Sequence, residues 1–499
     1  MEKRGFTFRN GFLYCEDVRV KDIQTDLSTN GIVPSSPCFV YSKEKIVSNI
    51  SAYQTALKML NISTLLNFSM KANHTPAILQ IVRSMGCSVT LVSGMELKMA
   101  LKLGFDPRLT VFNGNGKQDW ERLLAIEEGC LINVDSPFDL MQTMRMCQKL
   151  RKNSNVLLRI NPDIDPQVHP FISTGLANSK FGINTEDLEE CVTLLEKCSQ
   201  ITLVGLHCHL GSTIHNVSVF RLCTMKLLSL KSELKTRGFN NIKYINIGGG
   251  LGINYKQLAE RTSPARSSCT MSLEDGYTQT TVQGNNARQL NVTERVSQND
   301  LDYNSGCSEL MHDDLKVPTP GGLVECIQSA LVDSEVTLIL EPGRSLVGNT
   351  AILATTVLGT KGNQTKRFIV IDGAMTEVPR PSLYGAYHHI ELSEPTDIVQ
   401  VDKTTNRSSL NDPHRQVYDV VGPVCESTDF LGKERLLPEP HEGCGLAIFD
   451  VGAYCSSMSS NYNLRLRPCE VMVDGSTWHI IRRPDTFADL FEPYEGHWQ

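Results

Sequence analysis

Four groups of chemically capable residues follow short apolar runs in this chain. Lys71 lies in "NFSMKANH", where an apolar run gives way to a helical pattern. His209 lies near the end of "LVGLHCHL", glycines within 248–252 follow "YINI", and Glu341 opens "EPGR". Together they offer an amine, a flat imidazole, bare backbone N–H groups, a carboxylate and a guanidinium. This set suits a phosphorylated cofactor that is held through a Schiff base.

Pyridoxal phosphate would use every one of these groups. Its aldehyde can form a Schiff base with the amine of Lys71, and the imidazole of His209 can stack on its ring. The glycines, with Ser212, can bind the phosphate, because exposed backbone N–H groups attract anions. Glu341 can hydrogen-bond the ring nitrogen and keep it protonated, so that the ring withdraws electrons from the substrate. A carboxylate at this position favours loss of CO2, whereas an arginine would suit a racemase.

Taken one at a time, these features have simpler interpretations. A lysine at a strand end is usually a solvated charge, and a run of glycines can be only a tight turn. His207 and His209 share one face of a strand, so they could be a core pair or two metal ligands of a barrel hydrolase. No further histidine or aspartate stands clearly at the ends of the first, fourth or fifth strands, which speaks against metal. The cofactor interpretation therefore rests on the combination.

The elements that would position these groups form a repeating pattern. Eight short β-rich runs alternate with helical patterns such as "GMELKMALKLGF", where apolar residues recur on one helical face. Eight strand–helix units predict a (β/α)8 TIM barrel, whose functional groups gather at the carboxyl ends of its strands. An open doubly wound sheet is the alternative. The runs cover 63–70, 88–93, 109–114, 130–136, 155–161, 202–210, 244–250 and 336–344.

Three segments lie outside this repeat. Residues 346–499 are β-rich, with glycine, proline and asparagine between the runs, and they predict a C-terminal β-domain of the sandwich or barrel type. The N-terminal strands within 1–42 are expected to join that domain, which leaves 43–345 for the cofactor-binding barrel. The polar stretch at about 260–314 has no apolar periodicity and is expected to be a disordered insertion.

The composition excludes several classes of protein. The 499 residues carry a net charge of -7 and no basic stripe, so no nucleic-acid partner is expected. No apolar run approaches the roughly 20 residues that a membrane-spanning helix needs. The 16 cysteines without CxxC pairs favour reduced thiols in an intracellular protein over a disulfide framework. The N-terminal residues resemble neither a signal nor a transit peptide, so we expect a cytoplasmic enzyme, or a plastid one if a presequence is missing.

A set of longer motifs resembles one family. They include "SMKAN", "VSGMEL", "GNGK", "HCHLGS", "IGGGLG", "EPGRS", "RPSLYGAYH", "VGPVCESTDFLGK" and "GAYCSSMSSNYN". Together they resemble the diaminopimelate decarboxylases, which belong to the alanine-racemase-like group of pyridoxal-phosphate enzymes, and the match runs from about 37 to 475 apart from the insertion. The resemblance implies decarboxylation of meso-2,6-diaminopimelate to L-lysine. It also implies a homodimer of barrel plus β-domain, with active sites completed across the interface.

The resemblance also assigns roles to individual residues. It implies catalytic roles for Lys71, for His209 and for Cys425, which the second subunit would donate to protonate the carbanion. The cofactor contacts that it implies are Lys71, His209, Ser212, Gly249, Gly250, Glu341, Pro342, Gly343, Arg344 and Tyr454. The substrate contacts that it implies are Arg344, Arg380, Tyr384, Glu426 and Tyr454. No metal is implied. From the sequence alone, without the "GPVCES" context, Cys425 would instead be a small buried hydrophobe.

Two departures and two competing functions remain open. Bacterial relatives usually carry aspartate where this chain has Thr90, and the polar insertion is foreign to the family pattern. Decarboxylation of another basic amino acid, ornithine or arginine, is the first alternative, and a catalytically dead regulatory relative is the second. Arg380 stands where ornithine decarboxylases carry aspartate, which favours a substrate with a second carboxylate. Its simpler interpretation is an ion pair with a structural acid.

Overall fold

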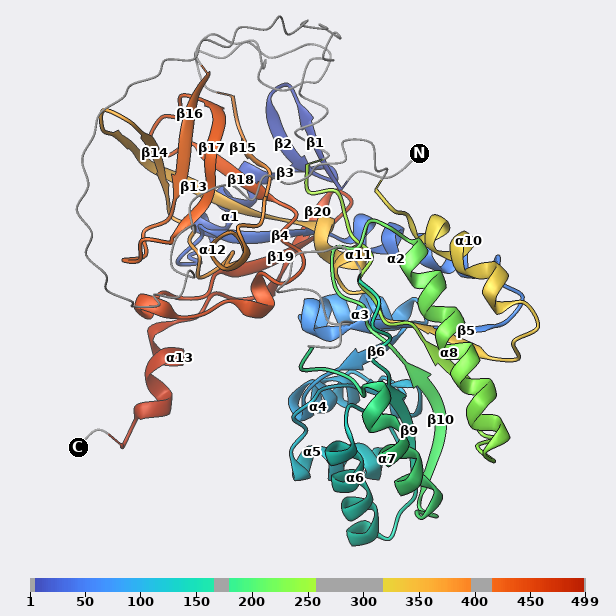
Figure 1. Cartoon of the computed structure of the whole chain (residues 1–499). Coiled ribbons are helices and arrows are strands. Elements are labelled where there is room, and N and C mark those ends of the chain that lie inside the picture. Colours follow the sequence, from blue (N-terminus) through green and yellow to red (C-terminus); the bar gives the residue numbers. More distant parts are fainter. Residues whose placement is uncertain (1–4, 166–178, 257–316, 396–414, 498–499) are drawn as a thin grey trace, which may run out of the picture.

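A closed barrel of eight parallel strands forms one main part of the protein, at the lower right of Figure 1. The computed structural model describes residues 5–165, 179–256, 317–395 and 415–497. The barrel closes where β5 pairs with β12, with Leu66 opposite Leu340, so the alternative of an open sheet is wrong. Each of the eight predicted runs overlaps one barrel strand, which confirms the TIM barrel. The strands are β5 (Ser63–Ser69), β6 (Ser88–Leu91), β7 (Val111–Phe112), β8 (Leu131–Val134), β9 (Ser154–Arg159), β10 (Ile201–His207), β11 (Tyr244–Asn246) and β12 (Thr337–Leu340).

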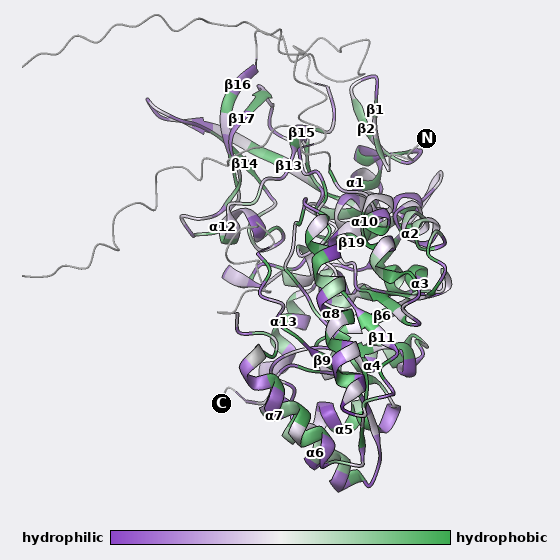
Figure 2. Ribbon diagram, turned by 45° about the vertical axis from the view of Figure 1, so that its right-hand side comes forward, coloured by the Kyte–Doolittle hydropathy of each residue, from purple (hydrophilic) through white to green (hydrophobic). Residues whose placement is uncertain are grey.

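Amphipathic helices surround the barrel. In α3, Ile78, Leu79 and Val82 are buried, which is the spacing of one helical face. Figure 2 shows mixed hydrophobic and hydrophilic residues along α6 and α8, as expected for helices with one buried side. Capping residues mark where helices begin. For example, the hydroxyl of Ser93, at the start of α4, accepts a hydrogen bond from the backbone N–H of Glu96. The helices are α2 (Lys43–Leu57), α3 (Pro76–Ser84), α4 (Gly94–Lys102), α5 (Asp119–Glu128), α6 (Pro137–Leu150), α7 (Thr185–Glu196), α8 (Ser218–Thr236) and α10 (Pro320–Leu331).

A second, β-rich region lies beside the barrel and takes one strand from the N-terminal segment. β4 (Cys38–Ser42) runs parallel to β19 (Cys469–Asp474) and antiparallel to β13 (Ala351–Gly362), as Figure 1 shows. The order in this sheet is β17-β16-β14-β13-β4-β19-β20, and β18 also pairs with β13 and β15. The remaining strands are β14 (Arg367–Ile371), β15 (Ile390–Leu392), β16 (Arg415–Val421), β17 (Phe430–Pro438), β18 (Gly445–Phe449) and β20 (Thr477–Arg482).

The first strands of the chain form a separate small sheet. β1 (Phe6–Arg9), β2 (Phe12–Cys15) and β3 (Val18–Arg19) pair with one another, and α1 (Val20–Thr29) follows them. Phe8 and Leu13 pack in one apolar cluster with Ile352 and Phe449, which belong to β13 and β18. The predicted association of the N-terminal strands with the β-domain is therefore made by pairing at β4 and by side-chain packing at β1 and β2.

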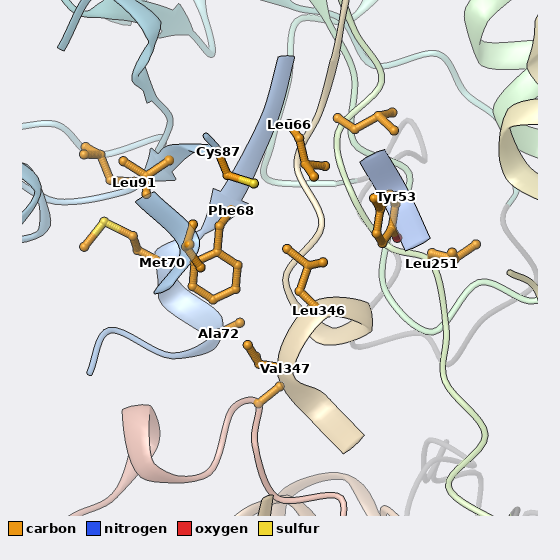
Figure 3. Close-up of a cluster of buried hydrophobic side chains, with 14 of the residues drawn as sticks. Tyr53, Leu66, Phe68, Met70, Ala72, Cys87, Leu91, Leu251, Leu346 and Val347 are labelled. Atoms are coloured by element: carbon orange, nitrogen blue, oxygen red, sulfur yellow. The ribbon is translucent and has the colours of Figure 1, made fainter. Parts of the chain in front are cut away.

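An apolar cluster fixes the segment that follows β5 (Figure 3). Phe68 and Ala72 lie against Leu346 and Val347 of the short helix α11 (Arg344–Val347), which follows β12. All four side chains are buried. Because burying a large apolar side chain stabilises the fold by about 1.5–3 kcal/mol, this cluster holds the ends of β5 and β12 together.

Most cysteines are free, and one pair is bonded. Cys208 and Cys223 form a disulfide between the end of β10 and α8, while the twelve other described cysteines are free. The prediction of reduced thiols misses this pair, because no local pattern shows that α8 places one cysteine beside the other. No described helix has the length and apolarity to cross a membrane. The insertion predicted at about 260–314 falls within the 257–316 gap, outside the described residues.

Candidate active site

Lys71 lies on a single 3-10 turn, Met70–Ala72, directly after β5. Its side chain is exposed, whereas both neighbours on the turn are buried, so the turn presents the amine outward from a fixed backbone. Ser69 anchors this turn to the end of β12. Its backbone N–H donates to the carbonyl of Pro342 at 3.1 Å, and its hydroxyl donates to the carbonyl of Glu341 at 2.8 Å. The "MKA" and "EPGR" motifs therefore meet.

His209 follows β10 and faces the glycine loop. The backbone N–H of Gly249 donates to its Nδ1 at 3.3 Å. Burial first, and then the positive charges of Lys71 and Arg159, hold the pKa of His209 well below its usual range. The imidazole is therefore neutral at physiological pH. A flat, neutral ring can stack on the ring of an aromatic cofactor.

The glycine loop after β11 packs too tightly for side chains. A Cβ on Gly249 would lie 2.1 Å from the carbonyl oxygen of Glu341, and one on Gly250 would lie 2.3 Å from that of Gly211. Gly250 also has a φ of 110°, which favours glycine. Its backbone N–H donates to no other described residue, so it can serve an anion. The predicted phosphate nest therefore has both the bare backbone and an available donor.

Arg344 joins the barrel to the β-rich region at this site. Its Nη2 donates to the Ser212 hydroxyl at 3.0 Å, and its Nη1 donates to the Tyr255 hydroxyl at 2.5 Å. Its guanidinium also lies 4.8 Å from the ring centre of Tyr454. Tyr454 has an uncommon positive φ of 58°, and its backbone N–H donates to the carbonyl of Ala72 beside Lys71. The fold thus brings Tyr454 to the predicted cofactor contacts.

Glu341 is buried at the end of β12 and held by two amides. Asn246 Nδ2 donates to its Oε1 at 2.7 Å, and Asn113 Nδ2 donates to its Oε2 at 3.1 Å. Burial opposes ionisation, but the attraction of His207, whose Nε2–H faces the carboxylate, and the hydrogen bond from Asn246, with a smaller contribution from Thr90, outweigh it and hold the pKa of Glu341 below its usual range. The group is therefore a carboxylate at neutral pH. An aspartate in place of Thr90 would bring a second anion to it.

His207 supports Glu341 from inside the barrel. Asn133 Nδ2 lies 2.8 Å from His207 Nδ1 and also donates to Asn113, so Nδ1 of His207 accepts and its proton sits on Nε2. That Nε2 faces Glu341 Oε2 at 3.5 Å. Burial lowers the pKa of His207, which keeps this ring neutral. His207 therefore serves a buried polar network, and the described residues contain no group of three or more potential metal ligands.

Arg380 is buried at the start of α12 (Arg380–Tyr384). Its guanidinium lies 4.7 Å from the ring centre of Tyr255, whose hydroxyl accepts a hydrogen bond from Arg344. Its Nη1 lies 2.8 Å from Nε2 of His388. Within the described part of the chain, no carboxylate forms an ion pair with Arg380. Its partner is thus an imidazole rather than the structural acid of the simpler interpretation.

Three predicted residues are exposed. The thiol of Cys425 is accessible, so the interpretation of Cys425 as a buried hydrophobe is wrong. Its backbone N–H donates to Asn463 Oδ1 at 2.8 Å. Glu426 is exposed, and Tyr384 is 37% exposed at the end of α12. The structure does not bring these three side chains onto the barrel residues of the same chain, and their roles stay predictions.

Sequence reasoning did not assign five further side chains of the site. They are Asn113, His207, Tyr255, Asn246 and His388. "HCHLGS" contains His207, "RPSLYGAYH" ends at His388, and the strand run "YIN" ends at Asn246, whereas Asn113 directly precedes "GNGK". The motifs could have pointed to these residues, but not to the groups that they touch.

The charge of Glu341 can be tested directly. We expect Glu341→Gln to lower kcat by roughly ten- to a hundredfold, because a hydrogen bond to a charged group contributes about 1.5–3 kcal/mol. Glutamine keeps the shape of the side chain, and its carbonyl oxygen can still accept the hydrogen bond from Asn246. Steady-state kinetics should show the loss, while the cofactor content of the purified protein stays near that of the wild type. An unchanged kcat would contradict a role for the charge.

Comparison with known proteins extends over nearly the whole chain. The family model described as "Pyridoxal-dependent decarboxylase, pyridoxal binding domain" matches residues 43–280. The chain is 41% identical to the probable chloroplastic diaminopimelate decarboxylase of Oryza sativa subsp. japonica, over 98% of this chain and 84% of that protein. It is 32% identical to the diaminopimelate decarboxylase of Aquifex aeolicus, over 97% and 96%. The crystal structure of the M. jannaschii diaminopimelate decarboxylase in complex with L-lysine has a TM-score of 0.78 at 28% identity, over 99% and 98%. The chain therefore belongs to the diaminopimelate decarboxylase family of pyridoxal-dependent decarboxylases.

Proposed function

We propose that this protein decarboxylates meso-2,6-diaminopimelate to L-lysine with pyridoxal phosphate as its cofactor. The observation that carries the proposal is the meeting of three groups at the barrel strand ends. Ser69, two residues before Lys71, donates to the carbonyl of Glu341 at 2.8 Å, and Gly249, which packs against that carbonyl, donates to His209 at 3.3 Å. These contacts support a site that combines the exposed amine of Lys71, the neutral imidazole of His209 and the buried carboxylate of Glu341. The names of the rice and bacterial relatives support the substrate.

The residues of the site fit the cofactor. When bound, pyridoxal phosphate withdraws electrons from the substrate α-carbon and so allows CO2 to leave. Lys71 would hold it covalently, and His209 would cover one face of its ring. Glu341 would keep the ring nitrogen protonated, because an ionised carboxylate favours a proton on its partner. The backbone of Gly250 and the hydroxyl of Ser212 would hold the phosphate.

Two arginines would meet the far end of the substrate. Arg344 and Arg380 both contact Tyr255, so their positive charges lie on one side of the site. Meso-diaminopimelate carries a carboxylate at the end that does not react, and a guanidinium matches a carboxylate with parallel hydrogen bonds. Ornithine and arginine end in a cation without that carboxylate. We therefore assign Arg380, with Arg344, to the distal carboxylate.

The experiment that tests the function is a measurement of CO2 release. Purified protein with bound pyridoxal phosphate should release CO2 from meso-diaminopimelate and form L-lysine in equal amount. A sample without added substrate is the control. Release from none of the amino acids tested would favour the alternative of a dead regulatory relative, although Lys71, His209, Glu341 and Cys425 are all present.

We further propose a homodimer in which Cys425 of one subunit serves the site of the other. The exposed thiol and its distance in sequence from the barrel ligands support this, as does the resemblance in the "GPVCES" motif. For location, the cytoplasm, with the plastid as the alternative, stays a prediction; the rice relative is named as chloroplastic.

The shared site predicts recovery of activity on mixing inactive variants. Lys71→Ala and Cys425→Ala are each expected to be inactive, because each removes one half of every site. Hybrid dimers would contain one intact site, so random exchange should restore about a quarter of wild-type activity. Subunit exchange is verified with two affinity tags. Hybrid dimers that form without any recovery of activity would refute a shared site.

A further inference from the structure

His388 is a fully buried histidine between the barrel site and the β-rich region. Its relative exposure is 0%, and both ring nitrogens have partners. Nδ1 lies 2.8 Å from the carbonyl oxygen of Phe449, at the end of β18. Nε2 lies 2.8 Å from Nη1 of Arg380. The ring therefore links a fixed strand end to the arginine assigned to the substrate.

The two contacts define the protonation of the ring. A carbonyl oxygen can only accept, so Nδ1 of His388 carries the proton and donates to Phe449. A guanidinium can only donate, so Nε2 offers its lone pair to Arg380. Burial first, and then the charges of Arg380 and Arg344, hold the pKa of His388 well below its usual range. The ring is therefore neutral at physiological pH and remains an acceptor for Arg380.

Tyr255 holds the same guanidinium from its face. Arg380 lies 4.7 Å from the centre of the Tyr255 ring, and the His388 ring meets that ring edge-on at 5.3 Å and 74°. One N–H of Arg380 is thus used by His388, and one face is covered by Tyr255. Since Arg380 has no ion pair with any described carboxylate, its other donors are available to an anion. The buried carboxyl of Asp450 is attracted by Arg380, but burial raises the pKa of Asp450 to about 7, so the arrangement fixes the orientation of the guanidinium without a direct ion pair.

We propose that His388 is a positioning residue that orients Arg380 toward the distal carboxylate of the substrate and so determines specificity. This inference rests on the proposed function, since it needs a ligand with that carboxylate. A neutral hydrogen-bond acceptor suits this task better than a carboxylate would. A carboxylate in direct contact would neutralise the positive charge of Arg380, which the carboxylate of the substrate needs. His388 touches neither the reacting carbon nor the cofactor contacts described above, so its effect should fall on binding.

Two substitutions separate the two contacts of His388. Asparagine can replace Nδ1 toward Phe449 but is too short to reach Arg380. Glutamine can place its side-chain oxygen near the position of Nε2 and keep the acceptor for Arg380. His389 provides a matched control, because it is also buried but contacts Glu391 at 3.0 Å. The three variants are His388→Asn, His388→Gln and His389→Gln.

The readout is the affinity for two ligands that differ only in the distal carboxylate. L-lysine keeps that carboxylate, whereas cadaverine has the same carbon chain and both amines but lacks it. Calorimetry on cofactor-loaded enzyme gives a Kd for each. We expect His388→Asn to reduce the preference for L-lysine over cadaverine by about tenfold or more, because a hydrogen bond to a charged group is affected. Its Kd for cadaverine should stay within about twofold of wild type.

The other two variants should keep the preference for L-lysine near the wild-type value. In kinetics, His388→Asn should raise KM for meso-diaminopimelate more than it lowers kcat. Equal weakening of L-lysine and cadaverine in His388→Asn would overturn the proposal, because it would indicate a merely structural role. If the asparagine variant does not fold, loss of the preference in His388→Gln would overturn it, and retention would support it.

The experiment also separates this inference from the proposed function. A wild-type enzyme that releases no CO2 from meso-diaminopimelate would refute the function itself. A wild-type enzyme that does release CO2, together with an unchanged ligand preference in His388→Asn, would refute the role of His388 alone.

Discussion

Replacing Lys71 with alanine is expected to lower kcat for meso-diaminopimelate by about a thousandfold or more. The amine is the group that would hold the cofactor covalently, and nucleophilic attachment of this kind splits a difficult step into easier ones. Each factor of ten in rate corresponds to about 1.4 kcal/mol in the free energy of activation. The turn that carries Lys71 is fixed by its buried neighbours and by Ser69, so the fold should survive the change. Single-turnover CO2 release and thermal unfolding measure the two effects separately.

A matched lysine and a chemical trap make this test specific. Lys98 is also exposed, and its amine lies 5.2 Å from the ring centre of Trp120, on the outside of the barrel. Lys98→Ala should keep near-wild-type kcat. Borohydride treatment of the wild type should abolish the visible absorbance of the bound cofactor and fix it to the peptide that contains Lys71. An adduct on any other lysine would refute the assignment at the end of β5.

The barrel could be predicted because its signals are local and repeated. Each run such as "STLLNFSM" is short, apolar and followed by a helical pattern, and eight of these units favour closure. Closure places all the carboxyl strand ends at one end of the barrel. Lys71, His209 and Glu341 could therefore be grouped before any coordinates, although they lie far apart in the sequence. Their proximity follows from topology rather than from side-chain detail.

The partners of these residues could not be predicted in the same way. Tyr255 meets both Arg344 and Arg380, and His388 meets Arg380, only because the β-rich region packs against the end of the barrel. No periodicity in the sequence encodes that packing. The amides that hold Glu341 come from two other strand ends, and their donor atoms are defined by the register of the barrel. Motifs thus identify which residues matter, while long-range packing determines what each one touches.

The wild-type enzyme is expected to prefer meso-diaminopimelate over ornithine, arginine and L-lysine as substrates by at least about 100-fold in kcat/KM. Each charged hydrogen bond from a guanidinium fork to the distal carboxylate contributes about 1.5–3 kcal/mol, or about ten- to a hundredfold. When the competing substrates react at their α-carboxylate, their far end is a cation without a carboxylate. Arg380 would repel that cation, so discrimination should exceed the gain from attraction alone.

Removing Arg380 should erase most of that preference while leaving the cofactor bound. Arg380→Ala deletes the fork but touches none of the contacts of Lys71, so the visible absorbance of the bound cofactor should persist. Arg380→Lys is the control for charge, because lysine keeps the cation but lacks the planar fork and should recover only part of the preference. Initial rates of CO2 release with the four amino acids measure each ratio. Comparable wild-type rates with ornithine would instead favour a polyamine-type decarboxylase, because the two buried arginines would then have failed to select the carboxylate that their charge and geometry fit.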